Sequence, residues 1–104
     1  MNKSTKKPRY MGVYDAILAA ETREECVKLF DDLLSVTEQR AMEQRYQVAK
    51  MLNNGMIYGE ILEKTGASSA TISRVNRSLQ YGTGGYELIF SRLAEQEDGS
   101  EAGE

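Results

Sequence analysis

The chain has 104 residues, 40% hydrophobic and 28% charged, which is enough for one globular domain with a tail at either end. No apolar run approaches the ~20 residues of a membrane span, and the basic start MNKSTKKPRY lacks the apolar stretch of an export signal, so we expect a cytoplasmic protein. The sequence contains no histidine, which excludes His-based catalytic triads and His metal clusters, and its single cysteine excludes an internal disulfide.

The net charge of −3 is unevenly distributed along the chain. Residues 95–104, EQEDGSEAGE, carry five acidic and no basic residues, and without them 13 basic residues stand against 11 acidic ones. From Lys64 to Tyr86 there is no Asp or Glu, whereas Lys64, Arg74 and Arg77 all lie there. An acid-free segment with cations can approach a polyanion, so the acidic total does not exclude nucleic acid as a partner.

The apolar residues recur at helical spacing and nowhere alternate as in a strand, which predicts an all-α chain of about six helices. We expect a basic arm over 1–12, one helical domain over 13–94 and a disordered acidic tail over 95–104.

Helix starts are marked by capping-box spacings. A first apolar stripe covers 13–18, and Thr22 with Glu25 then opens a second helix. Ser35 with Glu38 repeats the spacing and opens a long third helix. A stripe shared with valine and leucine predicts that Arg45 leans inward from this third helix.

A short fourth helix is expected over about 57–64, with Ile61 and Leu62 inward and Gly66 as its stop. After it comes TGASSATISRVNRSL, residues 65–79, in which six of fifteen side chains carry a hydroxyl. Ser and Thr are mediocre helix formers, because their side chains compete for backbone hydrogen bonds. Yet Ile72 and Val75 begin a buried helical stripe, and Ser68 is a good N-cap for a fifth helix.

Two short helices joined by a glycine-containing turn form the helix-turn-helix pattern. With the apolar stripe buried, the outward side of the second helix carries small, hydroxyl and arginine side chains. Hydroxyls and a helix N-terminus suit phosphate, and arginine can hold a guanine edge. The predicted DNA-binding residues are Lys64, Ser68, Ser69, Ala70, Thr71, Ser73, Arg74 and Arg77. A small helical module that binds another protein and no DNA is the alternative that this spacing leaves open.

The stretches DLLSVTEQRAMEQRYQVAKML and TGASSATISRVNRSLQYG resemble the Trp repressor superfamily, and within it the YerC/YecD-type branch. The resemblance covers roughly residues 29–93, and GASSATISR is its most specific part. It implies an intertwined homodimer whose N-terminal helices interlock, acting as a regulator of transcription on double-stranded DNA and not as an enzyme. No metal, cofactor or membrane partner is expected.

The resemblance also implies a ligand pocket between the dimer core and the reading helix, which is the second helix of the helix-turn-helix and contacts the DNA bases. Arg45 and Arg74 fall where the family has a core arginine and the arginine of its reading helix. Val75 stands where the tryptophan-responsive protein has a glycine that leaves room for the indole ring. A branched side chain there should fill that space, so we expect no tryptophan as a corepressor.

Overall fold

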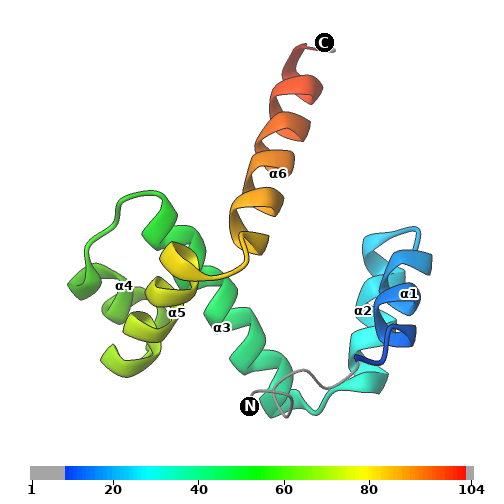
Figure 1. Cartoon of the computed structure of the whole chain (residues 1–104), viewed down its shortest axis with the longest axis horizontal. Coiled ribbons are helices and arrows are strands. Elements are labelled where there is room, and N and C mark those ends of the chain that lie inside the picture. The colour runs from blue at the N-terminus through cyan, green and yellow to red at the C-terminus, as the bar shows by residue number, and fades with distance from the viewer. Residues whose placement is uncertain (1–8, 103–104) are drawn as a thin grey trace, which may run out of the picture. The chain divides into compact units, whose positions relative to one another are not determined.

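The computed structural model describes residues 9–102 and contains helices but no strand over that range, which confirms the all-α prediction. Its helices are α1 (Gly12–Ala19), α2 (Arg23–Leu33), α3 (Val36–Asn53), α4 (Tyr58–Thr65), α5 (Ser69–Tyr81) and α6 (Gly85–Ala102) (Figure 1). The described chain divides between residues 39 and 40 into two compact units. Most of the predicted basic arm, residues 1–8, lies outside the described residues.

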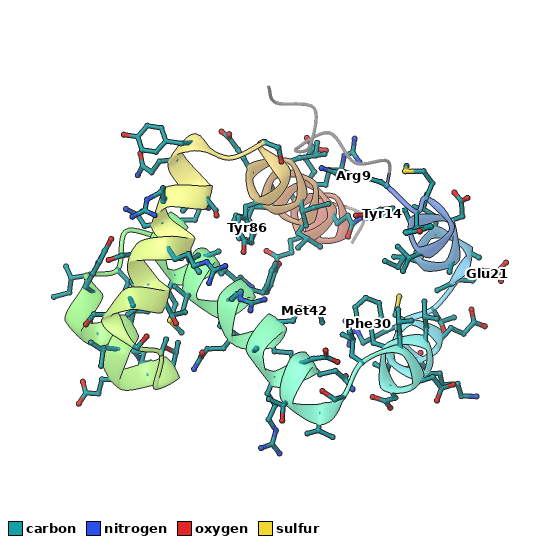
Figure 2. The ribbon with its side chains drawn as sticks, turned by 60° about the horizontal axis from the view of Figure 1, so that its bottom comes forward. Arg9, Tyr14, Glu21, Phe30, Met42 and Tyr86 are labelled. Atoms are coloured by element: carbon teal, nitrogen blue, oxygen red, sulfur yellow. The ribbon has the colours of Figure 1, made fainter. Side chains whose placement is uncertain are left out.

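The N-terminal unit holds α1 and α2, which lie side by side (Figures 1 and 2). Neither helix has a buried residue, and large apolar side chains such as Leu18, which is 81% exposed, stand open to solvent. Over the described residues, the apolar stripes that the sequence predicts are therefore present as helical faces whose side chains are at most half-buried.

The predicted capping residues do begin their helices. The Thr22 hydroxyl accepts a hydrogen bond from the Glu25 N–H at 3.1 Å. At the start of α3, the Glu38 N–H donates to the Ser35 hydroxyl at 3.1 Å, and the Ser35 N–H donates to the Glu38 carboxylate at 2.8 Å. Hydrogen bonding to the Glu38 carboxylate, first from the Ser35 backbone and then from the Ser35 side chain, holds the pKa of Glu38 below its usual value.

The C-terminal unit has a core made by α3, α4 and α5. Its buried side chains are Val48, Ala49, Ile61, Ala67, Ile72 and Val75. Because Ile72 and Val75 are buried as the stripe predicts, the opposite face of α5 is exposed. Leu62 was expected inward as well, but it is 41% exposed. One residue along a helix turns the side chain by about 100°, so Ile61 takes the inward position and Leu62 leaves it.

The turn between α4 and α5 consists of three residues, 66–68. Gly66 adopts φ +71°, a left-handed conformation that glycine reaches without a steric penalty, and its N–H bonds the Leu62 carbonyl. Ser68 then caps α5, because its hydroxyl accepts a hydrogen bond from the Thr71 N–H at 3.1 Å. Gly66 thus ends α4 and Ser68 begins α5, as the sequence predicted.

Over residues 95–102 the acidic segment is helical where disorder was predicted, because α6 continues from Gly85 to Ala102, and residues 103–104 lie outside the described residues. The first part of α6 packs on α3, where the Phe90 ring meets the Tyr46 ring edge-on, with the ring centres 5.6 Å apart. Extending an existing helix costs much less than nucleating one, and Glu, Gln and Ala are good helix formers. The composition that indicated a polar tail is therefore compatible with helical propagation.

Replacing Ile72 with alanine should destabilise the protein by roughly 2–5 kcal/mol, because it empties a fully buried position between α4 and α5. Ser73→Ala, one residue further on the exposed side, is the matched control and should change the free energy of unfolding by less than about 0.5 kcal/mol. Urea unfolding followed by circular dichroism measures both. Equal stability of the two variants would contradict this assignment of the core.

Candidate nucleic-acid interface

The exposed face of α5 carries five of the predicted residues: Ser69, Ala70, Ser73, Arg74 and Arg77. The first turn holds the small side chains, so a flat surface can approach the backbone of α5 closely there. The arginines follow in the middle of the helix. The structure therefore brings these five residues together on one side of one helix, and α5 has no acidic residue in its first turn.

The other three predicted residues are placed differently. The Ser68 hydroxyl is occupied by the N-cap and also lies 3.1 Å from the Thr71 hydroxyl. Thr71 is half-buried and lines the same cavity as residues of α3. Lys64 is exposed in the last turn of α4, next to a separate hollow that it shares with Arg40 and Gln47 of α3. Of these three, Lys64 alone presents a charged group to solvent.

A cavity of about 340 Å³ separates α5 from α3 and the start of α6. Its lining residues are Ala41, Gln44, Arg45, Thr71, Arg74, Val75, Ser78 and Tyr86. Figure 2 shows Tyr86 at the start of α6, near α5. All three residues of the predicted ligand pocket, Arg45, Arg74 and Val75, thus border one cavity. With two guanidinium groups and no carboxylate in its lining, the cavity favours an anionic group.

Arg45 is nevertheless exposed, where the stripe on α3 predicted an inward lean. The buried positions of α3 are taken by Val48 and Ala49, closer to the α4–α5 hairpin. Arg45 lies one turn before them, where the neighbouring helices leave open space. Val75, in contrast, is only 3% exposed and belongs both to the core and to the wall of the cavity.

The family model of the Trp repressor protein matches residues 9–94, most of the chain. The chain belongs to the Trp repressor family. An uncharacterized protein of Bacillus subtilis strain 168, YerC, is 45% identical over 85 residues, which are 82% of each chain. This relative places the chain in the YerC-type branch of the family, as the sequence motifs predicted.

Two solved structures of this family have the same fold. A candidate Trp repressor from Staphylococcus aureus superposes with a TM-score of 0.81 at 45% identity, over 90% of this chain and 95% of that one. A TrpR-like protein from Eubacterium eligens gives a TM-score of 0.82 at 44% identity, over 89% of this chain and 96% of that one.

Sequence reasoning missed several residues of the cavity, namely Ala41, Gln44, Ser78 and Tyr86. A signal for Ala41 was available, because it lies four residues before Arg45 on α3, and Gln44 lies three residues after Ala41. Gln44 is also anchored, since its side-chain amide donates to the Thr65 carbonyl at 3.1 Å and so ties α3 to the end of α4. Tyr86 follows a glycine-rich connection, whose path in space the sequence does not define.

Two other kinds of site are absent from the described residues. None of the helices there combines the length and the apolarity that crossing a membrane requires. No group of three or more His, Cys, Asp or Glu side chains in that part of the chain is arranged to hold a metal ion.

Proposed function

We propose that this protein is a sequence-specific DNA-binding regulator of transcription, acting as a dimer and not as an enzyme, with α5 as the helix that enters the major groove. The observation that carries the proposal is the two-sidedness of α5. Ile72 and Val75 fix one face in the core, and the other presents Ser69, Ser73 and Arg77 to solvent. In helix-turn-helix proteins the second helix lies in the major groove, and its N-terminal residues contact base edges.

The electrostatics of the hairpin support the same proposal. Because the segment from Lys64 to Tyr86 has no carboxylate, no negative charge on α5 or the turn opposes approach to phosphate. The small side chains of Ser69 and Ala70 lie at the end of α5 that would enter the groove first. Membership of the Trp repressor family agrees with this assignment.

Dimerisation is supported by the N-terminal unit. A helix pair without a buried residue gains little stability from packing within one chain. The exposed apolar side chains of α1 and α2 include Val13, Leu18, Val27 and Leu33. A second copy of the chain that covers them would supply the missing hydrophobic burial and would place two α5 helices on one DNA duplex.

Selection of bound duplexes from a random pool should recover a two-fold symmetric sequence with half-sites about 34–36 Å apart. If binding of Arg74 and Arg77 from two protomers to phosphates releases one counterion for each arginine, the affinity for duplex DNA should fall about 100-fold between 50 and 200 mM salt.

Light scattering at micromolar concentration should give the mass of a dimer.

A monomeric mass, or a recovered DNA sequence without two-fold symmetry, would contradict the proposal that a dimer recognises the DNA. If no duplex is retained at either salt concentration, the protein is not a DNA-binding regulator, and the alternative of a protein-binding helical module takes its place.

We further propose that tryptophan is not a corepressor of this protein. The supporting observation is Val75, whose buried side chain occupies the wall between α5 and the cavity. Calorimetric titration of tryptophan into the protein, with and without a selected duplex, should therefore give no saturable heat. Saturation at micromolar tryptophan, or a tenfold gain in DNA affinity with it, would contradict this prediction.

A further inference from the structure

The last residue of α5, Tyr81, is a large aromatic side chain that is 84% exposed. It continues the outer stripe of the helix, because Arg74, Arg77 and Tyr81 follow one another at helical spacings of three and four residues. The hydrophobic core does not account for Tyr81, and neither does the cavity beside α3.

The backbone fixes Tyr81 in the final turn of α5. The Gly82 N–H donates to the Ser78 carbonyl at 2.9 Å, and a Cβ atom at Gly82 would collide with that same carbonyl oxygen. Glycine is therefore needed for this close approach, and the helix ends directly after Tyr81. The backbone of Tyr81 thus belongs to the same rigid helix as that of the arginines.

A shallow concavity of about 340 Å³ connects these side chains; its lining residues are Arg74, Arg77, Ser78, Tyr81 and Gly82. It offers guanidinium groups and hydroxyls and contains no carboxylate. Arginine, serine and tyrosine side chains are common donors to phosphate oxygens in protein–DNA complexes. The chemistry of the concavity therefore fits an anion with several oxygens.

The length of α5 indicates which part of DNA reaches this concavity. Tyr81 lies twelve residues after Ser69, about 18 Å further along the helix axis. The major groove is about 12 Å wide, so a helix that enters with its N-terminal turn has its C-terminal turn outside the base edges. There it meets the sugar–phosphate backbone.

We infer that the concavity at the end of α5 holds one backbone phosphate of bound DNA, with Arg77 and Tyr81 as its contacts, while the first turns of α5 face the bases. The inference rests on the proposed function. It adds Tyr81 to the DNA-binding residues, and it makes Arg77 a contact that adds affinity on every sequence.

The test compares Tyr81→Phe, Arg77→Gln and the wild type on two duplexes, one selected by the wild type and one scrambled to the same composition. Tyr81→Phe removes only the hydroxyl and should weaken binding about three- to tenfold, by the same factor on both duplexes. Arg77→Gln should also weaken both equally and should reduce the steepness of the log–log salt dependence by about 0.9 for each Arg77 removed.

Arg92→Gln on α6 is the matched control, because it removes the same charge from an exposed position away from the concavity and should change neither affinity nor salt dependence. All variants change exposed side chains, and thermal melting checks that they remain folded. Wild-type affinity in Tyr81→Phe and Arg77→Gln, or a loss confined to the selected duplex, would overturn the inference alone. A wild type that retains neither duplex would overturn the proposed function with it.

Discussion

The burial of Ile61 with Ile72 and Val75, where α4 packs on α5, is the contact on which the rest of the account depends. Since these side chains are 0–3% exposed, α5 cannot rotate about its axis without exposing apolar surface. One face of the helix is therefore fixed inward and the other outward. The Ser68 cap and the left-handed Gly66 fix the residue at which α5 begins, and so fix its N-terminal end. Rigidity of this kind is what a surface for recognising DNA needs, because a side chain can discriminate between bases only from a defined position.

The same contact also shapes the cavity beside α3. Val75 contributes to both the core and the cavity wall, so the volume available next to Arg45 is limited by a residue that the fold needs buried. Arg74 borders this cavity as well as the concavity at the end of α5. The Arg74 side chain therefore lies between the cavity beside α3 and the concavity in which Arg77 and Tyr81 are proposed to hold a phosphate. An anion bound in the cavity would therefore lie next to the proposed DNA-binding surface.

Most of the helical architecture could be predicted from the sequence, because it depends on local chemistry. Ser35, Ser68 and Gly66 act within one turn of their own positions, and the stripe through Ile72 is a property of a single helix. Membership of the Trp repressor family could also be predicted, from the stretch GASSATISR and the long third helix.

Features that depend on contacts between helices could not be predicted in the same way. The inward lean expected for Arg45 failed because periodicity gives a face but not how far the neighbouring helix extends over it. Leu62 failed for a related reason, since the helix turns its side chain about 100° away from that of the fully buried Ile61. The half-buried position of Thr71 depends on how α5 packs near α3, and the place of Tyr86 in the cavity depends on the path of the chain between α5 and α6. The acidic composition of residues 95–102 predicted disorder, but the helix that precedes them supplies the nucleus.

The most direct test of the central claim is NMR titration of the wild-type protein with a duplex recovered from the random pool, followed through the backbone amides. If α5 reads DNA, the largest shift changes will fall in the N-terminal half of the helix, at Ser69, Ala70 and Ser73, with a second set at Arg77 and Tyr81. The amides of α6 around Arg92 will change little. Unchanged signals throughout α5, with the largest changes in α1, α2 or α6, would contradict the account.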